Sequence, residues 1–126
     1  MHKSKLAGLI IDCRTGDLKS AASFWSAALG MDTRALPGPQ GEKYVRLMDP
    51  GDRLHIEVQT VDHESRVHLD IEADDVEAEV SRLEKLGAKR VAQIHTWWVM
   101  QAPTGQKFCV VRVQSSDFAK SAREWD

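Results

Sequence analysis

Long apolar runs, basic runs and closely spaced cysteines are all missing from this sequence of 126 residues. No uninterrupted apolar stretch approaches the ~20 residues that a membrane-spanning helix needs, and no signal peptide is visible. The net charge is −2 and lysine and arginine form no cluster, which argues against nucleic acid as a partner. We therefore expect a cytoplasmic protein that binds neither membranes nor nucleic acid.

Cysteine is scarce as well. The two cysteines, Cys13 and Cys109, are far apart in the sequence and form no CxxC-type motif. Both lie in apolar, β-rich runs, a placement typical of reduced thiols in a cytoplasmic protein. A chain of this length suits one domain that buries a real core without help from disulfides.

The most informative segment is residues 66–87, RVHLDIEADDVEAEVSRLEKLG. Its first part alternates, which predicts a strand with Val67, Leu69 and Ile71 on one face. The opposite face is polar, and it carries His68, Asp70 and Glu72. Because a histidine on a polar strand face can bind a ligand or a metal, His68 is the first candidate for a functional residue.

Each strand is expected to lead into an amphipathic helix. After residue 73, Asp74 stands at the position of an N-cap, Glu77 completes a capping box, and Gly87 provides a left-handed stop. The same unit occurs earlier: the apolar run 6–12 precedes Asp17, which can cap a helix that Gly30 ends.

The strand–helix unit is followed by further strands in both halves. The strand-like runs are 43–48 and 53–59 after the first helix, and 90–94, 97–101 and 107–113 after the second. We interpret this as an internal repeat within one domain, 1–126, with module one at 5–60 and module two at 65–114. Residues 33–42 are expected to form a mobile loop, and the tail 115–126 a short amphipathic helix.

The repeat, the segment HLDIEADDVEAEVSRLEKLGA and the ending WWVMQAPTGQKFCVV resemble the vicinal oxygen chelate superfamily, in its glyoxalase-like and bleomycin-resistance-like branch. The resemblance implies an α+β fold in which paired βαβββ modules form a half-open barrel around a pocket. It does not identify a reaction, because the superfamily includes isomerases, dioxygenases, epimerases, thiol transferases and metal-free drug-binding proteins.

Metalloenzymes of this superfamily place one ligand on the first strand and one on the last strand of each module. By this resemblance His68 and Glu57 match two ligand positions, Cys109 replaces the usual glutamate at a third, and the fourth falls near Gly8, where no residue can bind a metal. A Glu/His/Cys set would suit zinc, whereas a hard cation would bind weakly. We expect no cofactor or a weakly bound divalent metal.

Three further residues are candidates for ligand binding. His55 shares a strand face with Glu57, and it can face either the pocket or solvent. Trp97 and Trp98 alternate on a strand, so one faces the core side while the other faces the pocket or solvent. A pocket tryptophan would stack on a planar ligand, but a tryptophan that fills the core is an equal alternative.

Two classes of function are compatible with these residues. In the first, the protein binds a small planar or oxygenated molecule in the barrel pocket without strong dependence on a metal. In the second, it is a metal-dependent lyase, isomerase or dioxygenase that uses Glu57 and His68 as ligands. We also expect a homodimer, to which Phe118, Ala122 and Trp125 of the tail would add apolar surface.

Overall fold

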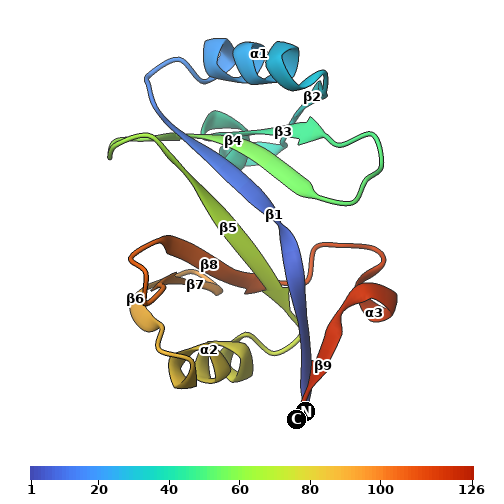
Figure 1. Cartoon of the computed structure of the whole chain (residues 1–126). Helices are drawn as coiled ribbons and strands as arrows, with labels where there is room; N and C mark the ends of the chain where they lie inside the picture. Colours follow the sequence, from blue (N-terminus) through green and yellow to red (C-terminus); the bar gives the residue numbers. More distant parts are fainter. The chain divides into compact units, whose positions relative to one another are not determined.

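The computed structural model describes residues 1–126, which divide into two compact units (Figure 1). The first unit is Gly8–Val67, and the second unit combines Met1–Ala7 with His68–Asp126. Strand β1 (His2–Arg14) contributes its beginning to the second unit and its remainder to the first.

The first unit begins with the end of β1, followed by helix α1 (Leu18–Leu29). Strand β2 (Asp32–Ala35), a 3-10 helix (Gly38–Glu42), β3 (Tyr44–Met48) and β4 (His55–Val61) complete it. Its strand order is β2-β3-β4-β1, with β4 parallel to β1 and the other pairs antiparallel. Asp17 caps α1 by accepting a hydrogen bond from the backbone N–H of Ser20, and Gly30 ends it at φ 67°, as expected.

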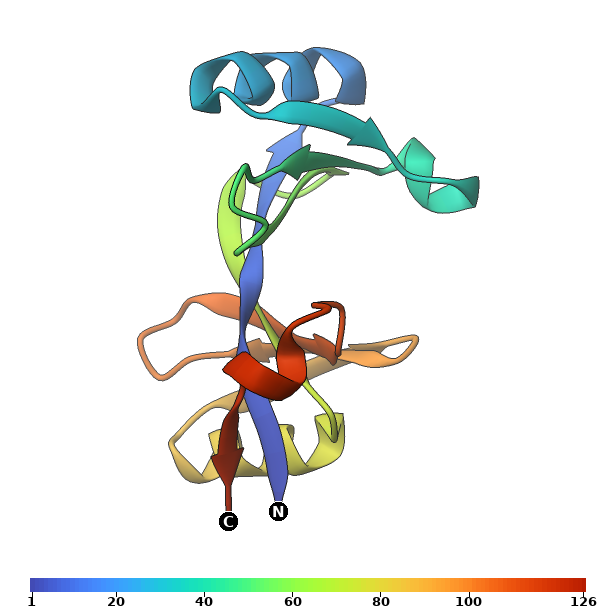
Figure 2. The same ribbon diagram turned by 90° about the vertical axis from the view of Figure 1, so that its right-hand side faces the viewer.

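Helix α1 covers one face of these strands (Figures 1 and 2). The core between helix and strands contains Ile11, Leu47, Ile56 and Val58, all buried. Because side chains alternate along a strand, the residues between these positions point to the opposite face, which α1 does not cover. We call that side of each unit its helix-free face.

The second unit repeats this plan with β5 (Arg66–Ala73), α2 (Val76–Lys85), β6 (Lys89–Ile94), β7 (Trp97–Gln101) and β8 (Lys107–Arg112). Its strand order is β5-β8-β7-β6, again with the first and last strands parallel and the other pairs antiparallel. Both units therefore have the topology of a βαβββ module, which confirms the expected α+β fold with paired modules.

The start of α2 differs from the expectation by one residue. The N-cap is Asp75, which accepts a hydrogen bond from the backbone N–H of Ala78. The carboxylate of Asp74 instead accepts a hydrogen bond of 2.8 Å from the backbone N–H of Lys3. Glu77 does not complete a capping box but pairs with Arg90. Gly87 follows the helix at φ 108°, as its role as a stop predicts.

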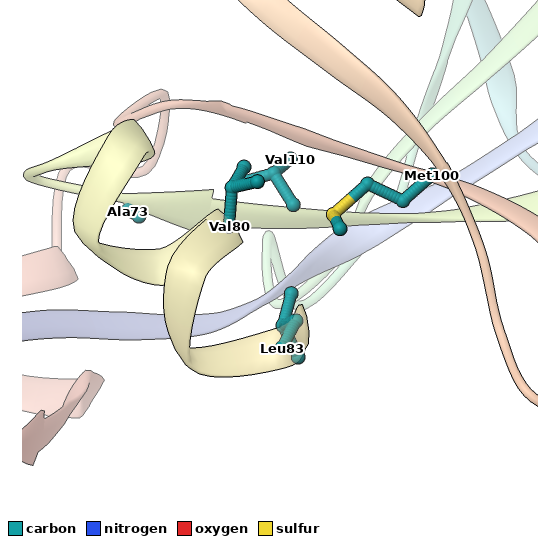
Figure 3. Close-up of a cluster of buried hydrophobic side chains, with 5 residues drawn as sticks. All are labelled: Ala73, Val80, Leu83, Met100 and Val110. Carbon is teal, nitrogen blue, oxygen red and sulfur yellow. The ribbon is translucent and has the colours of Figure 1, made fainter. Parts of the chain in front are cut away.

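The core of the second unit lies between α2 and its strands, and Figure 3 shows its buried members. They are Ala73, Val80, Leu83, Met100 and Val110. Along β5 the alternation is as expected, but the burial is not: Val67 and Leu69 are exposed, while Asp70 and Glu72 are buried. From the apolar side of β5, only Ile71 and Ala73 reach the core under α2.

The tail and the predicted loop are more regular than expected. Residues 33–42 contain most of β2 and a 3-10 helix. The tail forms one helical turn, α3 (Phe118–Ser121), and then a strand, β9 (Arg123–Trp125), rather than one amphipathic helix. Strand β9 pairs antiparallel with the start of β1, so both chain ends lie side by side in the second unit (Figures 1 and 2). The tail thus packs on its own unit.

A buried carboxylate, Glu79 of α2, holds both terminal strands. Its oxygens lie 2.8 Å from His2 Nε2 and 2.9 Å from Ser4 Oγ, and they accept two hydrogen bonds from the guanidinium of Arg82. Trp125 donates its indole N–H to Ser4 Oγ and lies under Arg82. Burial alone would raise the pKa of Glu79, but the hydrogen bonds from Arg82, His2 and Ser4 hold that pKa below its ordinary value.

No helix in the structure has the length and apolar character needed to cross a bilayer.

Candidate functional site

The helix-free face of the first unit carries a histidine–glutamate pair. His55 and Glu57 are two residues apart on β4, opposite in direction to the buried Ile56 and Val58. His55 Nε2 lies 2.7 Å from Glu57 Oε2, and both side chains are largely but not fully buried. Glu57 therefore has a partner within its own strand, and the two groups can share or transfer a proton.

The beginning of this face has no side chain to contribute. Gly8 pairs with His55 across the parallel strands β1 and β4. A Cβ atom at Gly8 would lie 1.9 Å from the backbone oxygen of His55, far inside van der Waals contact. The backbone of β4 thus occupies the space that a side chain would need, so residue 8 neither supplies a metal ligand nor has room for one.

Strand β3 adds an arginine and a tyrosine to the same face. In the antiparallel register of β3 and β4, Arg46 lies opposite Glu57 and Tyr44 lies opposite Gln59. The side-chain amide of Gln59 donates a hydrogen bond of 2.9 Å to the tyrosine oxygen. Arg46 reaches Asp52 through Nη2 at 3.4 Å, but its Nε is buried and has no hydrogen-bond partner. A guanidinium with a spare, buried N–H is suited to hold a carboxylate or another oxygen acceptor.

The helix-free face of the second unit brings together His68 and Asp70 of β5 with Cys109 of β8. Asp70 and Cys109 are direct partners across the parallel strands, and His68 precedes Asp70 by two residues on the same face. One potential ligand atom from each residue lies within 4.8 Å of the other two. His68 Nε2 is 3.4 Å from Asp70 Oδ1, and both Asp70 and Cys109 are buried.

Glu72, the next residue on this face of β5, has a structural role. It is fully buried, and its Oε2 accepts hydrogen bonds from the backbone N–H groups of Gln114 and Ser115 at 3.0 and 3.2 Å. These contacts fix the start of the tail to β5.

The two tryptophans of β7 are separated by the pleat of the strand. Trp98 packs against the core under α2, and the guanidinium of Arg90 lies 4.9 Å from the centre of its ring. Trp98 shares the face of the buried Met100, so its ring is part of that core. Trp97 lies on the opposite face, the one to which Cys109 belongs, and its ring contacts that of His95.

Among the predicted metal ligands, the structure brings His68 and Cys109 together. Glu57 lies in the first unit beside His55, so its proximity to His68 stays a prediction. Asp70, which the alternation placed on the polar face beside His68, is 8% exposed and belongs to the cluster. Its position could have been found, because parallel pairing of the first and last strands puts Asp70 opposite Cys109.

The comparison with known families gives one match: the sequence model of a glyoxalase-like domain covers residues 8–111. A comparison with curated proteins gives no match.

Solved structures share the fold over most of the chain, at identities that support the fold alone. A hypothetical protein from Bacillus halodurans has a TM-score of 0.60 at 13% identity, covering 90% of this chain and 98% of that protein. A glyoxalase/bleomycin resistance protein/dioxygenase superfamily member from Vibrio splendidus has a TM-score of 0.54 at 17% identity, covering 90% and 100%. A methylmalonyl-CoA epimerase from Streptomyces coelicolor, in complex with 2-nitronate-propionyl-CoA, has a TM-score of 0.51 at 11% identity, covering 89% and 97%.

Proposed function

The chain belongs to the family of glyoxalase-like domains, and from this premise we propose that it binds a small, oxygenated, partly planar molecule on the helix-free face of its first unit. The observation that carries the proposal is the set of half-buried polar side chains on β3 and β4 of the first unit. These residues are Tyr44, Arg46, His55, Glu57 and Gln59. A soluble domain rarely keeps so many partly buried polar groups on one face unless they contact a ligand.

Each of these groups has a part in the proposed binding. The spare N–H of Arg46 holds a carboxylate or an enolate-like oxygen of the ligand. His55 and Glu57, joined at 2.7 Å, hold a proton that can be donated to or taken from the bound molecule. Trp97, on the helix-free face of the second unit, stays a separate candidate for stacking a planar ligand.

We further propose that this binding does not depend on the hard divalent cation that many superfamily members use. Gly8 supplies no ligand, and one of the two carboxylate oxygens of Glu57 is already engaged by His55. A metal-dependent lyase, isomerase or dioxygenase built on Glu57 and His68 would have to use the other carboxylate oxygen of Glu57, because Oε2 lies 2.7 Å from His55. Hard cations such as Mg²⁺ and Mn²⁺ prefer several oxygen ligands, so the donors on this face are too few for them.

Ligand-induced thermal stabilisation tests the proposal. Protein treated with a chelator is titrated with benzoate, salicylate and catechol, which share a planar ring and differ in the carboxylate and hydroxyl groups. We expect salicylate to raise the melting temperature most, because it offers both a carboxylate to Arg46 and a hydroxyl to the His55–Glu57 pair. Saturation at 100 times the Kd would add about 2.7 kcal/mol of stability.

The control separates specific from general charge effects. Arg46→Ala should abolish the response to benzoate and salicylate, whereas Arg53→Ala, which removes an exposed arginine of the same unit, should leave it unchanged. Equal responses in wild type and Arg46→Ala, or a response that appears only when divalent metal is restored, would contradict the proposal.

A further inference from the structure

The cluster of His68, Asp70 and Cys109 has features that ligand binding in the first unit does not explain. The three side chains come from two adjacent strands of one unit, on the face that α2 does not cover. They combine an imidazole, a carboxylate and a thiol. Each of these groups binds transition metals, and the three together are a much rarer arrangement than a cluster of carboxylates.

The strongest evidence for a metal site is the buried carboxylate of Asp70. The residue is 8% exposed, and its Oδ1 is buried with no hydrogen-bond partner. His68 Nε2 lies 3.4 Å from this oxygen, too far for a good hydrogen bond. A buried carboxylate oxygen that accepts no hydrogen bond costs on the order of 1–3 kcal/mol, and more when it is charged. A cation placed between Asp70, His68 and Cys109 would remove this cost.

The separation of the donor atoms fits a small tetrahedral ion. Zinc binds sulfur at about 2.3 Å, and imidazole nitrogen and carboxylate oxygen at about 2.0–2.2 Å, so neighbouring donors lie roughly 3.3–3.7 Å apart. His68 Nε2 and Asp70 Oδ1 already have this separation at 3.4 Å. All three donors lie within 4.8 Å of one another, so the remaining donor pairs are at most about 1 Å wider than a tetrahedral zinc site requires.

The donor set also selects the metal. A thiolate ligand disfavours Mg²⁺, Ca²⁺ and Mn²⁺, which prefer oxygen, and favours zinc or cobalt in a nitrogen, oxygen and sulfur environment. Three protein ligands leave the fourth tetrahedral position for water or a ligand oxygen, which is the arrangement of catalytic rather than purely structural zinc.

We propose that His68, Asp70 and Cys109 form a three-ligand zinc site contained within the second unit. The site is independent of Glu57, Gly8 and the rest of the first unit. It differs from a set of ligands shared between two modules, because β5 and β8 of a single module supply every protein ligand.

Cobalt substitution tests the proposal without any assay of activity. Cobalt(II) added to metal-free protein should bind at one equivalent and give the near-ultraviolet charge-transfer band of a cobalt–thiolate bond, together with the intense visible bands of tetrahedral coordination. Zinc should abolish both sets of bands by displacement. Plasma-source elemental analysis after dialysis against zinc should find about one zinc per chain, as three ligands and one site require.

Cys109→Ser and Cys13→Ser form a matched pair of variants. Cys13 lies on β1 in the first unit, on the helix side, where burial raises the pKa of its thiol and keeps it protonated. We expect the charge-transfer band to vanish in Cys109→Ser and to persist in Cys13→Ser. His68→Ala and Asp70→Asn should each weaken zinc binding by more than ~100-fold, since even changes in groups around a metal site cost about 10–100-fold.

Some outcomes would overturn the zinc site. The first two are a cobalt–thiolate charge-transfer band that survives in Cys109→Ser and a charge-transfer band that is lost in Cys13→Ser. The other two are a zinc affinity that is unchanged in Asp70→Asn and a folded wild-type protein that binds no cobalt. Circular dichroism confirms that each variant is folded before it is compared. The binding of salicylate by chelated protein and its loss in Arg46→Ala are separate measurements on other residues, so failure of the zinc site leaves the proposed function intact, and the reverse also holds.

Discussion

Replacing Glu79 with glutamine tests how strongly one buried carboxylate ties the ends of the chain to α2. The side chain is 0% exposed, and it contacts His2, Ser4 and Arg82 with four distances between 2.8 and 2.9 Å. Glutamine keeps the volume and one acceptor oxygen, but its amide group places N–H donors against other donors. At least one of the two hydrogen bonds from Arg82 is therefore lost, together with the negative charge that Arg82 faces.

The magnitude follows from the kind of contact that is lost. Hydrogen bonds to charged groups contribute about 1.5–3 kcal/mol each, although the contributions within one network do not add. Removal of one partner from a buried ion pair costs about 3–5 kcal/mol. Because glutamine retains one acceptor, we expect a loss of about 3 kcal/mol in the free energy of unfolding. For a domain of this size, such a loss lowers Tm by about 10 °C.

Glu77→Gln is the control on the same helix. Glu77 also binds an arginine with two hydrogen bonds, of 2.6 and 3.0 Å to Arg90, but its side chain is 64% exposed. Exposed ion pairs contribute less than ~1 kcal/mol, so this variant should be nearly as stable as wild type. Urea unfolding followed by circular dichroism measures both variants. Equal losses for Glu79→Gln and Glu77→Gln would refute the claim that burial makes the difference.

The pH dependence provides a second check of the same reasoning. The pKa of Glu79 in the folded protein is held below its ordinary value of 4.5, so the folded state binds this proton more weakly than the unfolded state. The stabilisation by Glu79 is therefore fully present above about pH 5, and it is lost as the pH falls through the lowered pKa. The difference between wild type and Glu79→Gln should shrink as the pH falls below 4.5. A difference that stays constant down to pH 3 would contradict a charged Glu79.

Three further predictions concern the backbone, a helix cap and assembly. Gly8→Ala should lower the free energy of unfolding, measured in urea, by about 1–3 kcal/mol or more, because the new Cβ would meet the backbone of His55. Gly16→Ala, whose Cβ would have nothing within 4 Å, should leave the free energy of unfolding unchanged. Asp75→Ala should cost about 1 kcal/mol by removing the cap of α2, and a neutral result would point to another cap. Sedimentation of the protein at tens of micromolar should show a homodimer. A sedimentation profile that contains only monomer would contradict this prediction.

Local signals predicted the elements, and tertiary contacts corrected their ends. Asp17 and Gly30 delimit α1 as expected, because no other residue nearby competes for either role. Two adjacent acids, Asp74 and Asp75, have equal intrinsic capacity to cap α2. The choice between them depends on the backbone N–H of Lys3, 71 positions away, which no local pattern contains.

At the candidate site, the sequence likewise predicted only part of the arrangement of the side chains. Alternation in β5 correctly placed His68 and Asp70 on one face, but alternation cannot tell a hydrated aspartate from a buried one. Recognition of Asp70 as a member of the cluster requires the pairing of β5 with β8. The partner of Glu57 is His55, two residues away on the same strand face; alternation places both on that face but does not show that their side chains turn toward each other.

The division of β1 between the two units has a consequence for the growing chain on the ribosome. The first unit is continuous in sequence and can fold as soon as residue 67 has emerged. Residues 2–7, made before the first unit, belong to the second unit and must wait for residues 68–126, which at 5–20 residues per second takes roughly 3–12 s. During that interval the segment that later pairs with β9 has no strand partner. Neighbouring nascent chains on one message could exchange this segment, so strand-swapped dimers are the misfolded product to look for when expression is fast.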